Sequence, residues 1–179
     1  MPEAQRPIPR VLVGAVTSKS RTIEELGKSL AQEVRTAGFT LVRSVVVNGE
    51  AQFIQQLVSN VSNDNEADAI ILTGGTGFGP RDAVCEALDS FVGRRIEGFA
   101  QAYRQLLREQ MGHGAHAWLA RATAGVYNQC LVFALTGRVT DVSKAFQTLI
   151  APTLSDAVEV ATGRARTFQI LVGPPQPYR

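Results

Sequence analysis

Short apolar runs alternate with segments of helical periodicity along the first 72 residues, and this alternation restricts the fold more than any other feature. Residues 11–16 and 69–72 are continuous apolar runs, typical of strands buried on both faces. Residues 40–47 are rich in valine and predict another strand. Residues 23–37 and 51–61 carry apolar side chains at helical spacing. We therefore predict an α/β fold of right-handed βαβ units, with helices on both faces of a mostly parallel sheet.

The second half of the chain continues with helices and one strong strand. The predicted helices are residues 81–91, 98–110, 142–150 and 154–161. Residues 130–135 predict a strand that pairs with 125–127 through Asn128 and Gln129. Pro152 separates the last two helices, and the glycine- and histidine-rich residues 111–117 form a bend. We expect an N-terminal extension (1–9), one α/β domain (10–162) and an extended C-terminal tail (163–179).

Charge and hydropathy exclude two classes of partner. Eighteen basic residues against sixteen acidic ones leave a net charge of +2, and the basic residues are dispersed, so we expect no nucleic-acid partner. The adjacent Arg94 and Arg95 are expected on a solvated helix edge. No apolar run is long enough to cross a bilayer, and residues 1–10 lack the apolar core of a secretory signal. We expect a cytoplasmic protein with no membrane partner, whose isolated Cys85 and Cys130 are buried thiols.

A glycine-rich loop directly follows the apolar run 69–72, at the edge of the sheet where such folds bind ligands. Glycine lets the backbone approach an anion closely, and threonine hydroxyls add donors. A tight turn that binds nothing needs fewer glycines, so we favour a phosphate-binding loop. No Gly-Lys-Ser/Thr follows, and the glycine spacing does not fit a dinucleotide fingerprint. The loop residues are Thr73, Gly74, Gly75, Thr76 and Gly77.

Two acidic residues follow the loop and permit two interpretations. Asp82 and Glu86 are four residues apart, so on a helix they would share one face and could hold Mg²⁺ beside a phosphate. Equally, Asp82 could cap the helix while Glu86 is solvated. His113 and His116 are the only histidines, and their glycine-rich surroundings favour a surface loop over a metal site.

The glycine loop, followed by Arg81-Asp82 and Glu86-Ala87-Leu88, resembles the MoaB/MogA family of molybdenum cofactor biosynthesis proteins. The likeness continues through residues 96–99, 120–122, 124–126, 131–135 and 149–152, and covers roughly residues 10–154. The Glu-Gly-Phe segment at 97–99 points to the MoaB branch of the family.

The resemblance implies a three-layer α/β/α fold, a homotrimer or homohexamer, and a pocket for molybdopterin. It also implies that the terminal phosphate of the pterin can be adenylated from ATP with Mg²⁺. Carried over by position, Gly74, Gly75, Thr76 and Gly77 would cradle a phosphate, with Thr73 beside them. Asp82 would match the catalytic aspartate of the family.

Three ligand-facing segments depart from the family pattern, at residues 24–27, 48–50 and 135–139. Gly49 stands where active members carry an aspartate, and Arg138 stands where a serine is usual. Arg138 could fork onto a ligand phosphate, or it could pair with Asp82 or Glu86 in competition with Mg²⁺, and we favour the phosphate contact. Two functions remain open: a Mg²⁺-dependent molybdopterin adenylyltransferase, or an inactive oligomeric paralogue that binds a pterin or nucleotide. A flavodoxin-like domain is disfavoured because no phosphate loop follows Val16.

Overall fold

The computed structural model describes residues 7–17 and 20–164, and most of the predicted N-terminal extension and C-terminal tail lies outside these residues. The strands are β1 (Arg10–Val16), β2 (Thr40–Val47), β3 (Ala69–Thr73), β4 (Arg94–Arg95), β5 (Thr123–Tyr127) and β6 (Cys130–Leu135). The α-helices are α1 (Arg21–Thr36), α2 (Ala51–Asn63), α3 (Val84–Asp89), α4 (Glu97–Gln110), α5 (Val139–Ala145) and α6 (Leu154–Ala161). A 3₁₀-helix, η1 (Gly114–Leu119), follows α4, and a π-helical segment, η2 (Phe146–Ile150), follows α5.

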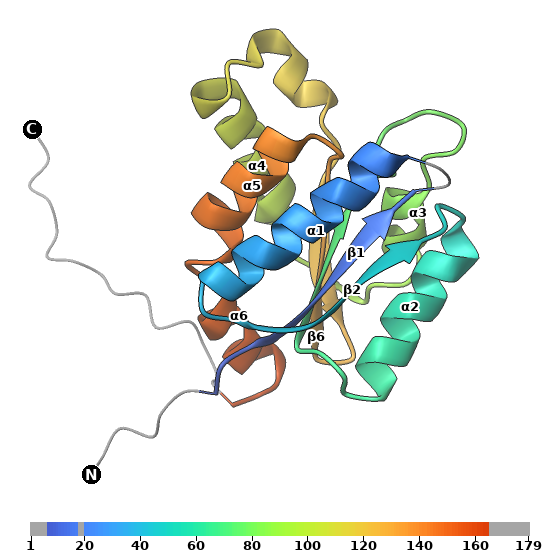
Figure 1. Cartoon of the computed structure of the whole chain (residues 1–179), viewed down its shortest axis with the longest axis vertical. Coiled ribbons are helices and arrows are strands. Elements are labelled where there is room, and N and C mark those ends of the chain that lie inside the picture. The colour runs from blue at the N-terminus through green and yellow to red at the C-terminus, as the bar shows by residue number, and fades with distance from the viewer. Residues whose placement is uncertain (1–6, 18–19, 165–179) are drawn as a thin grey trace, which may run out of the picture.

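All these strands form one sheet in the order β2-β1-β3-β6-β5-β4. The strands β2, β1, β3 and β6 are parallel, whereas β5 and β4 add to the β6 edge in antiparallel orientation. The α1, α4, α5 and α6 helices cover one face, and α2 and α3 cover the other (Figure 1). This arrangement confirms the predicted three-layer α/β/α fold with a mostly parallel sheet.

The apolar run of β1 supplies both halves of the core. Val11 and Val13 pack beneath α1, α4, α5 and α6, while Leu12 and Val16 pack against α2 and α3. Successive side chains of a strand point to opposite faces, so a strand covered on both faces must be apolar throughout. The β3 and β6 strands are likewise buried along their whole length.

Several element boundaries differ from those that periodicity predicted. The helix expected from residue 81 begins only at Val84, because Arg81 and Asp82 belong to a turn in which the Asp82 N–H donates to the Gly79 carbonyl. Arg94 and Arg95 are exposed as predicted, but they form the edge strand β4 rather than part of a helix. The single helix expected over 142–150 begins earlier, at Val139, and changes into a π-helical turn at Phe146.

The hairpin between β5 and β6 confirms the predicted pairing. Its two turn residues, Asn128 and Gln129, have positive φ angles of 44° and 71°, as a two-residue hairpin turn requires. Gly38 has a φ of 87° just after α1, in the left-handed conformation that commonly ends a helix. Within the described ranges, none of the helices combines the length and hydropathy needed to cross a membrane.

Candidate functional site

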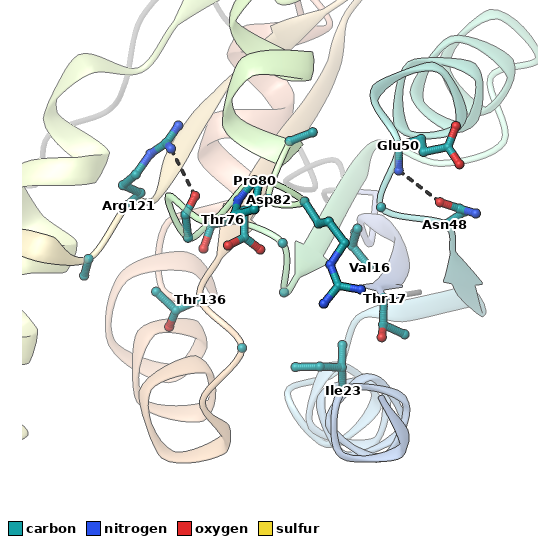
Figure 2. Close-up of a pocket in the computed structure, with 18 of the residues that line it drawn as sticks. Val16, Thr17, Ile23, Asn48, Glu50, Thr76, Pro80, Asp82, Arg121 and Thr136 are labelled. Atoms are coloured by element: carbon teal, nitrogen blue, oxygen red, sulfur yellow. Dashed lines mark hydrogen bonds between the residues drawn. The ribbon is translucent and has the colours of Figure 1, made fainter. Parts of the chain in front are cut away.

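A cavity of about 770 Å³ opens where the four parallel strands end. Its wall includes the residues that follow β1, β2, β3 and β6, together with the segment 119–121 that leads into β5. The connection that leaves β1 leads to β2 on one side, whereas the connection that leaves the neighbouring β3 leads toward the opposite side of the sheet, which makes this edge a topological switch point. Figure 2 shows the converging segments: Val16 and Thr17 after β1, Asn48 and Glu50 after β2, and Thr136 after β6.

The glycine loop forms the part of this wall that follows β3. Gly74 and Gly75 have positive φ angles of 89° and 65°, which side chains other than glycine rarely adopt. A Cβ atom at Gly74 would lie 2.6 Å from the Val16 carbonyl oxygen. A Cβ atom at Gly75 would lie 2.8 Å from Val84 Cγ2, so it would disturb the packing of α3. The glycines are therefore required by the conformation and packing of the loop itself.

Three backbone amides of the loop are available to a ligand. The Gly74 N–H donates to the Leu135 carbonyl, which fixes the start of the loop to β6. The amides of Gly75, Thr76 and Gly77, which line the cavity, donate to no acceptor among the residues that the structure describes. Adjacent free N–H groups of this kind are a recurrent way of binding a phosphate.

The two threonines of the loop have different surroundings. Thr73 is completely buried, and its hydroxyl donates to the Thr136 carbonyl at 2.9 Å, which joins the ends of β3 and β6. It does not line the cavity and supports the site from beneath. Thr76 is 3% exposed and lines the cavity beside the three free amides. Of the two predicted hydroxyl donors, only Thr76 lies at the cavity wall.

Asp82 lies at the cavity, but outside the helix. Its Oδ2 accepts the Gly79 N–H at 3.1 Å, so the carboxylate closes the turn that precedes α3. A Cβ atom at Gly77 would be 2.4 Å from the same oxygen. The carboxylate is thus packed directly against the loop that it was predicted to serve.

Glu86 belongs to the first turn of α3 and forms an ion pair with Arg121. The Arg121 guanidinium holds the pKa of Glu86 below its ordinary value, so this carboxylate stays ionised at neutral pH. Because Asp82 precedes α3, the two acids do not share the helical face from which a joint Mg²⁺ site was inferred. Throughout 7–17 and 20–164, no group of three or more His, Cys, Asp or Glu side chains is arranged to hold a metal ion.

Arg138 follows Gly137, a residue of the cavity wall, but its side chain is directed to His113. Arg138 Nη1 donates to His113 Nδ1, and His113 Nε2 lies 3.0 Å from Oδ1 of the buried Asp141. An arginine can only donate, so Nδ1 accepts and the Nε2–H is directed to Asp141. His113 thus lies in the bend between α4 and η1 with its ring held by two partners, whereas His116 is exposed.

Residue patterns alone did not assign a role to other groups of the cavity wall. Glu50 provides a second carboxylate, and its N–H donates to Asn48 Oδ1 at 3.0 Å. Arg121 is an isolated arginine between two alanines, which gives no periodic or motif signal beyond the family likeness. Val16, Ile23 and Leu119 add an apolar surface. These residues become neighbours only when the strand ends meet.

Comparison with known proteins identifies the family. Residues 11–156 match the family model described as a probable molybdopterin binding domain. The molybdenum cofactor biosynthesis protein B of Bacillus subtilis (strain 168) is 32% identical over 143 residues, which cover 79% of this chain and 84% of that protein. A crystal structure of a molybdopterin biosynthesis protein from Mycobacterium abscessus has a TM-score of 0.73 at 28% identity, covering 89% of this chain and 98% of that one.

A crystal structure of a molybdenum cofactor biosynthesis protein B has the same fold, with a TM-score of 0.82 at 24% identity over 89% of this chain and 99% of that one. The match to the family model extends from the second residue of β1 into α6, so it includes the whole sheet and the glycine loop. The chain belongs to the molybdenum cofactor biosynthesis proteins of the MoaB/MogA type.

Proposed function

We propose that this protein binds molybdopterin in the cavity at the strand ends, with the terminal phosphate of the pterin on the glycine loop. The observation that carries the proposal is the set of free amides at Gly75, Thr76 and Gly77, which lie together at the carboxyl end of a buried strand. Backbone amides bind a phosphate without any basic side chain. A family that handles a phosphorylated pterin would use such a loop.

The rest of the cavity suits a flat heterocycle that carries polar edges. Val16, Ile23 and Leu119 supply an apolar surface for the ring system. Asn48 and Thr136 supply groups that can exchange hydrogen bonds with ring heteroatoms. The volume of about 770 Å³ lies within the usual range for a site that encloses a small organic ligand.

A second proposed activity is transfer of AMP from ATP to the bound phosphate, and the presence of Asp82 and Glu50 at the same cavity favours it. The pterin phosphate oxygen would attack the α-phosphorus of ATP, and the bond to pyrophosphate would break. Mg²⁺ is commonly held by one or two carboxylates together with substrate phosphates. Asp82 fits that role, and Glu86 could join it only by leaving Arg121. The protein would mainly position the phosphates and stabilise their charge.

The competing proposal is a binding protein without transferase activity, and Gly49 favours it because the family pattern places an aspartate there. The structure leaves room for a Cβ atom at this position, since the nearest atom to it would be the Arg81 carbonyl oxygen at 3.7 Å. We therefore expect Gly49→Asp to fold normally and to raise any adenylation rate by adding a third carboxylate to the cavity.

Titration calorimetry with molybdopterin, followed by incubation with ATP and Mg²⁺, tests both proposals. Heat of binding together with an AMP-linked product supports the transferase. Binding without product, in the native chain and in Gly49→Asp, supports the binding protein and rejects the transferase. Failure of molybdopterin to bind would refute the proposed function as a whole.

A further inference from the structure

Arg121 joins the glycine loop to α3 and to the segment before β5. Its Nη1 donates to the Gly77 carbonyl at 3.0 Å, and its Nη2 pairs with Glu86 Oε1. Figure 2 shows the Arg121 side chain beside the loop, on the side away from Val16 and Thr17. About 31% of its side-chain surface is exposed, so the guanidinium is held by these partners rather than by complete burial.

The loop needs such a contact because glycine loses more conformational freedom on ordering than any other residue. Two backbone bonds order its first half: the Gly74 N–H donates to the Leu135 carbonyl, and the Val84 N–H donates to the Gly75 carbonyl. Beyond Gly75, the Cys85 thiol of α3 makes a long contact of 3.9 Å to the Thr76 carbonyl, and Arg121 donates to the Gly77 carbonyl at 3.0 Å. Because a thiol is a weak donor, the charged Arg121 contact is the stronger of the two. The free amides of Thr76 and Gly77 lie between these fixed points.

Fixing one carbonyl orients more than one atom. The peptide unit is planar and trans, so holding the Gly77 carbonyl sets the direction of the whole Gly77–Phe78 peptide plane. Arginine is suited to this task because its planar fork can donate to two partners at once in a fixed geometry. Here one arm donates to Gly77 and the other pairs with Glu86, which prevents the guanidinium from turning freely.

Glu86 then acts as the counterion of Arg121. Its carboxylate is ionised at neutral pH because Arg121 lowers its pKa, and it does not line the cavity. Glu86 therefore holds the Arg121 guanidinium in place, which is a different role from binding a metal ion or only facing solvent.

We propose that Arg121 is a positioning residue of the phosphate loop: with Glu86 as its counterion, it orders residues 76–79 before the ligand arrives. The proposal rests on the proposed function for the identity of the ligand, but the ordering of the free loop can be measured without any ligand. Glu86 therefore acts through Arg121 and is not a ligand of Mg²⁺.

The experiment compares amide hydrogen exchange of Gly74 and Gly79, the loop amides that donate hydrogen bonds, in the ligand-free protein with molybdopterin affinity by calorimetry. We expect Arg121→Ala to speed exchange in this loop by tenfold or more and to weaken binding by tenfold or more, with exchange in β1 unchanged. Arg121→Lys, which keeps one charged donor, should recover part of both effects. Arg43→Ala is the matched control, because Arg43 forms a comparable ion pair with Glu66 away from the cavity.

Glu86→Gln distinguishes two possible roles of Glu86, the counterion of Arg121 and a ligand of Mg²⁺. A counterion role predicts that the variant weakens molybdopterin binding by the same factor with and without Mg²⁺. A loss seen only with Mg²⁺ would overturn the proposal. So would an Arg121→Ala protein whose free loop exchanges at the native rate, whether or not its affinity falls. If the native protein does not bind molybdopterin but Arg121→Ala still loosens the loop, the proposed function fails and the positioning role stands.

Discussion

Individual residues in this site are constrained by the backbone and by their immediate neighbours. Gly74 and Gly75 are needed for their positive φ angles, whereas Gly77 is needed because Asp82 occupies the space of a side chain. The glycines of the loop therefore have two separate causes, the local backbone conformation and the packing of neighbouring atoms. The amides that remain free are the part of the loop that we propose binds a phosphate.

Gly77→Ala tests the contact between the loop and Asp82. The new Cβ would lie 2.4 Å from Asp82 Oδ2, so the carboxylate must move and release the Gly79 N–H. We expect molybdopterin affinity to fall about tenfold, equivalent to about 1.4 kcal/mol, in calorimetry. Gly93→Ala is the control, since no atom lies within 4 Å of a Cβ there. Equal affinities in the two variants would contradict the prediction.

Arg138→Ala tests the proposed contact between Arg138 and the ligand phosphate. Arg138 follows the cavity residue Gly137, and it can reach a phosphate only by leaving His113. Loss of one charge-assisted hydrogen bond should weaken binding by about 1.5–3 kcal/mol in a molybdopterin titration. Unchanged affinity would show that Arg138 does not contact the ligand and serves only as a partner of His113.

Tyr103 should make stability depend on pH in the alkaline range. Burial raises the pKa of its phenol to about 12, whereas an unfolded chain releases that proton near its ordinary value of about 10. The contribution of the neutral phenol is therefore complete below about pH 10 and is lost as pH rises toward 12. Tyr103→Phe removes the hydrogen bond to Thr136, which should cost about 1 kcal/mol at pH 7.

Urea unfolding of both proteins at pH 7 and pH 11 measures this dependence. Between these two pH values the native chain should lose more stability than Tyr103→Phe does. Cys130, whose pKa burial also raises to about 12, is present in both proteins and does not affect the comparison. An equal loss in the two proteins would show that Tyr103 is not responsible.

At the scale of elements, the ends of strands and helices determine which residues meet. The site gathers the carboxyl ends of β1, β2, β3 and β6, since parallel strands all end at one edge of the sheet. The short helix η1 is joined to the start of α5 through the hydrogen bond between His113 and Asp141. This bond holds the segment that supplies Leu119, Ala120 and Arg121 to the cavity.

His113→Ala should therefore destabilise the protein, because it leaves the buried Asp141 carboxylate without its histidine partner. Asp141 Oδ1 keeps the Thr140 hydroxyl, but only at 3.4 Å. A poorly satisfied buried carboxylate should cost about 1–3 kcal/mol, measurable as a lower free energy of unfolding in urea. The matched control is His116→Ala, which removes an exposed histidine from the same short segment. If both variants lose the same stability, the bond to Asp141 contributes nothing.

At the scale of the whole molecule, the sheet has two edges with different properties. The β2 strand forms one edge, and Val46 within it is 58% exposed, while Phe53 on the neighbouring α2 is 40% exposed. The β4 strand forms the other edge and carries only two arginines. Exposed apolar side chains beside an open strand edge are features that association between copies commonly covers.

We expect the protein to form a symmetric oligomer, either a trimer or a hexamer. Light scattering at micromolar concentration should then give a mass of three or six times the chain mass of 19.3 kDa. A mass near 19.3 kDa would refute this prediction. Val46→Lys should lower the measured mass if the β2 edge lies in the interface.

The sequence by itself determined the fold and the position of the glycine loop. Residues 11–16 and 69–72 had to be strands covered on both faces, because uninterrupted apolar runs of that length cannot face water. A run of glycines and threonines immediately after such a strand had to lie at the carboxyl edge of the sheet. Both conclusions depend on local residue pattern and spacing, which can be read directly from a single sequence.

Only the tertiary structure decided which side chains act together at the site. Arg121 contacts Gly77 across 44 positions of sequence, and His113 contacts Asp141 across 28. Helical spacing predicted that Glu86 would lie beside Asp82. In the structure Asp82 belongs to the turn at Gly79, before α3 begins, and Glu86 forms an ion pair with Arg121 instead. Such pairings depend on how separate strand ends and loops come together in the folded chain. Local periodicity does not encode contacts between residues so far apart in the sequence.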